Sequence, residues 1–131
     1  MSIRGWKLEF YPTNANSTTA RRDPVGHSLK KWRGLTSSNL EKHGLYRSGG
    51  GIQDSYYAFE INCNTCALCC KYPGPKCACY PLCKIVDGRP CDSNGSPFQI
   101  FMKFGDPLPM IRALEKAQAL PKAAARKRRN V

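Results

Sequence analysis

Apolar residues occupy every second position in three short stretches of the chain, residues 3–11, 56–61 and 98–104. This period is typical of a strand with one buried face. The three predicted faces comprise Trp6, Leu8 and Phe10 in the first stretch, Tyr57, Phe59 and Ile61 in the second, and Phe98, Ile100, Met102 and Phe104 in the third. We therefore expect three strands whose apolar faces form the core.

Two other stretches carry the signals of helix ends. Residues 25–44 predict two short helices separated by Gly34, the second with Ser38 as its N-cap and Gly44 just past its end. A later helix is predicted to begin after Asp106, with a proline in its first turn, and to end before Pro121. Its buried stripe would consist of Met110, Ile111, Leu114 and Ala117.

Polar and glycine-rich segments separate these elements. Residues 12–24 have almost no apolar side chain and predict a loop, in which Arg21 and Arg22 are interpreted as a solvated pair. The three consecutive glycines at positions 49–51 predict a flexible turn that acts as a linker, and residues 92–97 predict a second turn.

The fold class that follows is α+β, a small single domain with short strands and helices around a multi-cysteine metal-binding loop. The domain would comprise residues 1–121, the metal loop residues 63–91, and a basic tail residues 122–131. A chain of 131 residues can bury a modest core, and a metal would stabilise it further.

Every cysteine of the chain lies in that loop. The eight are Cys63, Cys66, Cys69, Cys70, Cys77, Cys79, Cys83 and Cys91. Spacings of one to three residues allow neighbouring thiolates to converge on one ion. Residues 1–18 lack the apolar core of a secretory signal peptide, so we expect a reducing cytoplasm, where clustered cysteines favour metal binding over disulfides or free thiols.

The spacing favours zinc over an iron–sulfur cluster. Zinc accepts four thiolates wherever two CxxC-like turns meet, so eight cysteines suffice for one to two ions. Cys63, Cys66 and Cys69 match the start of a ferredoxin pattern, but Tyr80 stands where its cysteine before proline would be. The histidines, His27 and His43, are alternative zinc ligands.

A closed, non-enzymatic site is favoured over a catalytic one. The sequence has no carboxylate between Cys63 and Cys83, and Asp87 is the only one before Cys91, so there is no local candidate for a water-activating base. An iron–sulfur or redox protein or enzyme that uses the clustered cysteines is the alternative.

The charge of the chain suggests its partners. Twenty-one Lys and Arg residues outweigh nine Asp and Glu residues, for a formal net charge of +12. Four of the basic residues are consecutive in the tail, Arg126, Lys127, Arg128 and Arg129. We expect contact with nucleic acid or with an acidic host protein, a merely solubilising tail being the alternative. No apolar run approaches the length of a membrane span, so no membrane association is expected.

Resemblances to two groups of proteins support the expectation of metal binding. The run Cys63-Asn-Thr-Cys66-Ala-Leu-Cys69-Cys70 resembles the opening CxxCxxCC of a group of zinc- or iron-chelating proteins. A wider succession over residues 29–117 is similar to small phage and bacterial proteins with a CxLC, CPL and distal-cysteine pattern; it includes KWRGL around Trp32, NLEKHGL from Asn39, DGRPC from Asp87 and GDPLPMIRALE from Gly105.

The second resemblance implies a ligand set. Its primary ligands would be Cys66, Cys69, one of Cys79 or Cys83, and Cys91, which leaves Cys63, Cys70 and Cys77 for a second ion. This chain departs from the pattern at Tyr80, which replaces the cysteine of Cys-Pro-Leu. The resemblance implies a phage or bacterial source and metal binding, but no particular activity.

Overall fold

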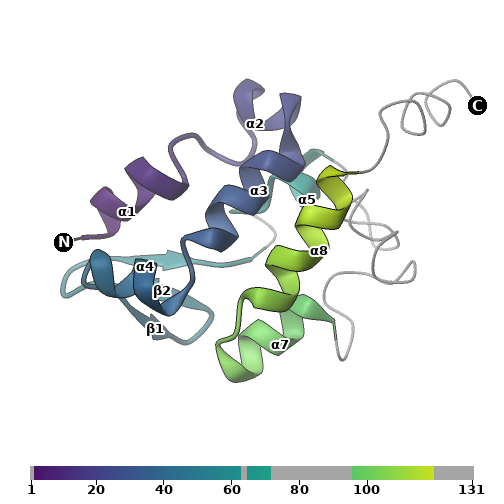
Figure 1. Ribbon diagram of the computed structural model, residues 1–131. Coiled ribbons are helices and arrows are strands. Elements are labelled where there is room, and N and C mark those ends of the chain that lie inside the picture. Colours follow the sequence, from purple (N-terminus) through teal and green to yellow (C-terminus); the bar gives the residue numbers. More distant parts are fainter. Residues whose placement is uncertain (1, 63–64, 72–95, 120–131) are drawn as a thin grey trace, which may run out of the picture.

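A computed structural model describes residues 2–62, 65–71 and 96–119, and shows helices packed beside a small antiparallel sheet (Figure 1). The helices are α1 (Ile3–Phe10), α2 (Thr18–Arg22), α3 (Pro24–Arg33), α4 (Ser37–Lys42), α5 (Ala67–Lys71), α7 (Pro97–Phe104) and α8 (Leu108–Gln118). The strands are β1 (Tyr46–Ser48), β2 (Gly51–Gln53) and β3 (Ala58–Glu60). The α+β class predicted from the sequence is confirmed.

The first predicted strand, residues 3–11, is wrong, because this stretch forms helix α1. Ile3, Trp6 and Phe10 are buried at helical spacing, whereas Leu8 is 71% exposed. The hydroxyl of Ser2 accepts a hydrogen bond from the backbone N–H of Gly5 at 3.0 Å and so caps the helix. The stretch fits both periods, and burial of Ile3 together with the cap decides for the helix.

The third predicted strand, residues 98–104, is also a helix, α7. The hydroxyl of Ser96 accepts a hydrogen bond from the N–H of Gln99, Pro97 occupies the first turn, and Gly105 ends the helix in the left-handed conformation with φ 75°. Phe101 is fully buried while Phe104 is 77% exposed, so the two do not share a buried face. These end signals are stronger than the apparent alternation.

The second predicted strand is confirmed in part as β3. Phe59 and Ile61 are buried, but Tyr57 is 72% exposed because it precedes the strand in a turn. β3 pairs with β2, and β2 pairs with β1, both antiparallel. The glycines at 49–51 form no linker: Gly49 adopts φ 56° in the tight turn between β1 and β2, and Gly51 belongs to β2.

The loop predicted for residues 12–24 contains α2, which Ser17 caps by accepting from the N–H of Ala20 at 3.1 Å. Arg21 and Arg22 at its end are exposed, as the interpretation of a solvated pair requires. The turn predicted at 92–97 lies mainly outside the described residues, as do Pro121 and the tail, residues 122–131.

The helices predicted around Gly34 and after Asp106 are confirmed as α3, α4 and α8. Gly44 follows α4 with φ 66°, but Thr36 rather than Ser38 occupies the N-cap position. Asp106 accepts a hydrogen bond from the N–H of Leu108 at 3.0 Å. The predicted stripe of α8 is buried, and its residues are Met110, Ile111, Leu114 and Ala117.

Helix α3 lies at the centre of the core, between α1 and α8 (Figure 1). On the side of α7, Trp32 meets Phe101 edge to face, with ring centroids 4.9 Å apart. On the side of α1, Trp6 is fully buried against Phe59, and its indole N–H donates to the carbonyl of Gly34 at 2.8 Å. The end of α3 is thereby fixed to α1.

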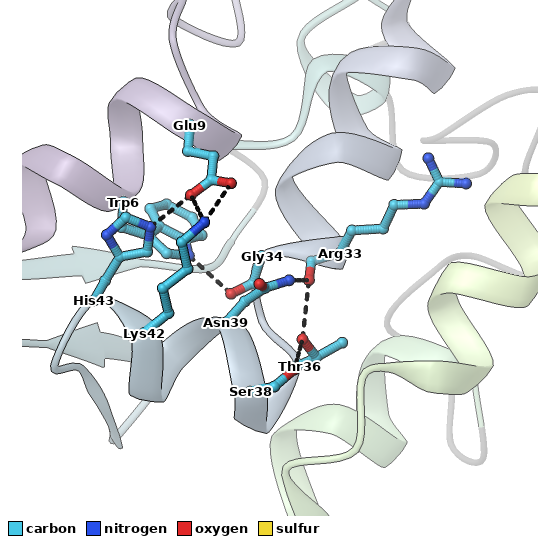
Figure 2. A network of polar contacts seen from close by, with 9 residues as sticks. All are labelled: Trp6, Glu9, Arg33, Gly34, Thr36, Ser38, Asn39, Lys42 and His43. Carbon is cyan, nitrogen blue, oxygen red and sulfur yellow. Dashed lines mark hydrogen bonds and ion pairs between the residues drawn. The ribbon is translucent and has the colours of Figure 1, made fainter.

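Beside the bond between Trp6 and Gly34, Figure 2 shows another contact of α1, this time with α4. The carboxylate of Glu9 accepts hydrogen bonds from Lys42 at 3.0 Å and pairs with Nε2 of His43 at 2.7 Å. These bonds, that of His43 first, lower the pKa of Glu9.

Gly34 is expected to be intolerant of a side chain. A Cβ added there would lie 2.5 Å from Cγ of Phe10, because α1 and the end of α3 approach closely. Gly34→Ala should reduce the free energy of unfolding by about 1–3 kcal/mol, measured by chemical denaturation. Gly50→Ala is the matched control, since its nearest neighbour is Cε of Met102 at 3.5 Å, and equal stability of the two variants would contradict this packing.

Stability should fall in acid. Asp54 accepts hydrogen bonds from the backbone N–H groups of Ile3, Tyr56 and Tyr57, and these bonds, that of Ile3 most, lower the pKa of Asp54. The pairing with His43 and Lys42 likewise lowers the pKa of Glu9. A carboxylate with a lowered pKa stabilises the fold above its ordinary pKa and loses this effect as pH falls through the lowered value. The melting temperature should therefore decline below about pH 4, and less steeply in Asp54→Asn. Parallel profiles for Asp54→Asn and the unmodified protein would contradict a role for Asp54.

Candidate metal centre

Three of the predicted ligands, Cys66, Cys69 and Cys70, lie at the start of α5 and within it. The other five, Cys63, Cys77, Cys79, Cys83 and Cys91, fall outside the described residues. Between the first two, Ala67 and Leu68 are fully buried and attach α5 to the core. The cysteines themselves are half-buried, so the helix presents its thiols at the margin of the core.

The turn before α5 is fixed by the side chain of Thr65. Its hydroxyl donates to the carbonyl of Glu60 at 2.9 Å and accepts from the N–H of Asn62 at 3.1 Å. Thr65 is thereby tied to the end of β3 and to Asn62, which fixes the position of the residue before Cys66.

Cys66 and Cys69 converge. The side chain of Cys69 is hydrogen-bonded to the sulfur of Cys66, and the backbone N–H of Cys69 donates to the same sulfur. The backbone N–H of Cys70 instead donates to the carbonyl of Cys66 at 3.0 Å. A CxxC turn that directs an N–H group toward a sulfur stabilises the thiolate, which is the form that binds a metal.

Helix α3 contributes two polar side chains to this region, Ser28 and Lys31, each only 1% exposed. Oγ of Ser28 lies 3.7 Å from Sγ of Cys66. Nζ of Lys31 donates to the carbonyl of Thr65 at 2.8 Å, next to Cys66. A buried lysine is costly unless it is hydrogen-bonded and negative charge lies nearby, and a Cys66 thiolate would supply such a charge.

These contacts change the acidity of Cys66. The hydrogen bond from Cys69 lowers the pKa of the Cys66 thiol most, the charge of Lys31 and the hydroxyl of Ser28 add to it, and burial opposes it; the resulting pKa is about 5. The lowered pKa favours the thiolate form of Cys66, which is the form that binds a cation.

The two histidines differ in their relation to the cysteines. Nε2 of His27 lies 2.7 Å from the carbonyl oxygen of Thr13, and its ring meets that of Tyr11 edge to face. Burial lowers the pKa of His27, so it is neutral, although the charge of Cys66 acts in the opposite direction. His43 is engaged by Glu9 at the contact between α1 and α4 (Figure 2).

Within the described ranges, no group of three Cys, His, Asp or Glu residues is placed to hold one ion. Cys66 and Cys69 would supply two of the four thiolates that a tetrahedral zinc requires. The donor set is thus compatible with zinc, and the remaining ligands would come from the cysteines outside the described residues.

Sequence reasoning did not identify Ser28 and Lys31. Their spacing of three residues places them on one face of α3, but a lysine in a short helix ordinarily faces solvent. Only the packing of the turn at Cys66 against α3 shows why this face is polar.

Comparisons with protein-family models, with curated proteins and with solved structures found no match to this chain.

Proposed function

We propose that this chain is a non-enzymatic zinc-binding protein whose metal stabilises the fold, and that it contacts nucleic acid or an acidic host protein. One observation supports the proposal of a metal site: the Cys66 and Cys69 sulfurs converge in a turn with a buried lysine beside them. A zinc ion with four thiolates has a net charge of about −2, which a buried cation offsets.

A closed site fits this arrangement better than a catalytic one. The groups that act on Cys66 from α3 are the hydroxyl of Ser28 and the ammonium of Lys31, and neither is the carboxylate that a water-activating zinc enzyme requires. All eight cysteines would hold one to two ions, Cys66 and Cys69 sharing the first.

The partner class follows from charge. The formal net charge of +12 and the run from Arg126 to Arg129 support contact with a polyanion or an acidic protein. None of the helices in the described part of the chain is long and apolar enough to cross a membrane. We place the protein in a reducing cytoplasm, that of the host if a phage encodes it, because thiolate ligands persist there.

The acidity of Cys66 also favours a second candidate, an iron–sulfur or redox protein. A thiolate within a CxxC turn is the nucleophile of thiol–disulfide chemistry. The two candidates differ in colour, since an iron–sulfur protein purified without oxygen is brown and a zinc protein is colourless.

Single cysteine variants test the zinc site. Cys66→Ser and Cys69→Ser should each lose more zinc than Cys70→Ser, because the first two sulfurs are hydrogen-bonded to each other, and the adjacent helical residues Cys69 and Cys70 point in different directions. Zinc content is measured by elemental analysis after gel filtration. Equal losses in all three variants would favour a shared cluster and contradict the assignment of Cys66 and Cys69 to one ion.

A further inference from the structure

A groove of about 560 Å³ lies between α1 and the start of β3. Arg4, Lys7 and Leu8 line it from α1, and Tyr57 and Ala58 line it from the opposite side. Its volume falls within the range of ~300–1,000 Å³ that is usual for ligand sites. None of the described cysteines lines the groove.

The α1 side of the groove is basic and apolar at once. Arg4, Lys7 and Leu8 are spaced three and four residues apart, so they share one face of the helix. Leu8 is 71% exposed, and both basic residues are exposed as well. None of the described residues that line the groove is acidic. Glu9, the acidic residue of α1, is engaged by Lys42 and His43 at the contact with α4 (Figure 2).

The opposite side presents Tyr57, the neighbour of Tyr56, on a fixed backbone. Tyr56 is 87% exposed and Tyr57 is 72% exposed. Oδ1 of Asp54 accepts hydrogen bonds from the N–H groups of both, each at 2.7 Å, while its Oδ2 accepts from the N–H of Ile3 at 2.8 Å. One carboxylate thus fixes the tyrosine turn to the first residue of α1, so the rings are presented without the entropic cost of ordering a loop.

We infer that this groove binds single-stranded nucleic acid, with a base stacked on Tyr57 and phosphates paired with Arg4 and Lys7. The inference rests on the proposed function and specifies its partner and the place of contact. Sequence-tolerant single-strand sites combine a positively charged groove with exposed aromatic rings, and both are present here. A duplex keeps its bases stacked and would offer Tyr57 only backbone, and an acidic peptide would use the charges but not the ring.

The test uses the full chain and a fluorescently labelled oligothymidine of about 12 nucleotides, within the site sizes of single-strand binding modules. Binding is followed by fluorescence anisotropy at several salt concentrations. Tyr57→Ala should weaken binding roughly 5- to 150-fold, the range for removal of a stacking ring. Tyr57→Phe should bind like the unmodified protein because it keeps the ring.

The charge variant gives a different signature. Arg4→Ala combined with Lys7→Ala should reduce the slope of log affinity against log salt by about 1.4, at ~0.7 for each phosphate contact with a single strand. The matched control is Arg112→Ala with Lys116→Ala, which removes the same charge from exposed positions of α8, on the other side of α3 (Figure 1). Tyr46→Ala, 53% exposed on β1, controls for loss of a surface tyrosine.

The outcomes separate this inference from the proposed function. If the unmodified protein ignores the oligonucleotide at low salt, or if polyglutamate competes as well as unlabelled oligothymidine, the groove does not bind a single strand. If the oligonucleotide binds but the groove and control variants are equally affected, the contact lies elsewhere. Each of these results overturns the inference and leaves the zinc site, which metal content tests, intact.

Discussion

Removal of zinc by a strong chelator is expected to unfold the region between Tyr56 and Phe104. Structural zinc sites contribute apparent free energies of ~10–16 kcal/mol in zinc-finger peptides, comparable with or larger than the ~5–15 kcal/mol that holds a whole domain folded. The effect should reach the core, because Ala67 and Leu68 next to the cysteines are fully buried. Loss of the ion would release α5 from its position against α2 and α3.

Circular dichroism before and after chelation measures this unfolding. The near-ultraviolet signal should collapse as the packing of Trp32 on Phe101 is lost, and added zinc under reducing conditions should restore it. The reversal separates loss of metal from oxidation of the thiols. If the spectrum and the melting temperature persist after elemental analysis has shown that the metal is gone, the ion is not structural.

Lys31→Met is expected to weaken zinc binding about 10- to 100-fold, the effect usual for groups that support the ligands of a metal. Methionine keeps the length and apolar stem of the side chain but removes the charge that favours the Cys66 thiolate. It also leaves the carbonyl of Thr65 without the ammonium of Lys31, at a cost to folding of about 1–3 kcal/mol.

Competition with a chromophoric chelator measures the affinity for zinc. Repeating it over a range of pH separates the effect on the Cys66 thiolate from the cost to folding. Because the pKa of Cys66 should rise in Lys31→Met, zinc binding should require a higher pH than in the unmodified protein. Lys30→Met removes the same charge from the neighbouring exposed position of α3. If the two variants bind zinc equally, Lys31 acts on the fold alone and not on the thiolates.

The sequence predicted best where local end signals agreed with the apolar period. Gly34 and Gly44 marked the ends of α3 and α4 correctly, and the stripe of α8 from Met110 to Ala117 is buried as expected. In α1 and α7 an alternation of a few residues was interpreted as a strand although Ser2 and Ser96 supply helix caps. Stretches this short fit both periods, and capping groups then carry more information than spacing.

Of the candidate site, only the pair of cysteines could be predicted from the sequence. The CxxC spacing predicts that Cys66 and Cys69 converge, and their sulfurs are hydrogen-bonded to each other. Nothing near Lys31 in the sequence indicates that it is buried, because its partner carbonyl belongs to Thr65, 34 residues away. Long-range contacts of this kind depend on the packing of α3 against α5, which spacing within one segment does not encode.

The most direct test of the zinc site is the metal content of the protein purified under reducing, oxygen-free conditions. Elemental analysis together with native mass spectrometry should find one to two zinc ions per chain and no iron, with the eight cysteines free of disulfides. A chain that carries no metal and has its cysteines paired in disulfides, or one that is brown and holds iron with sulfide, would contradict the proposal.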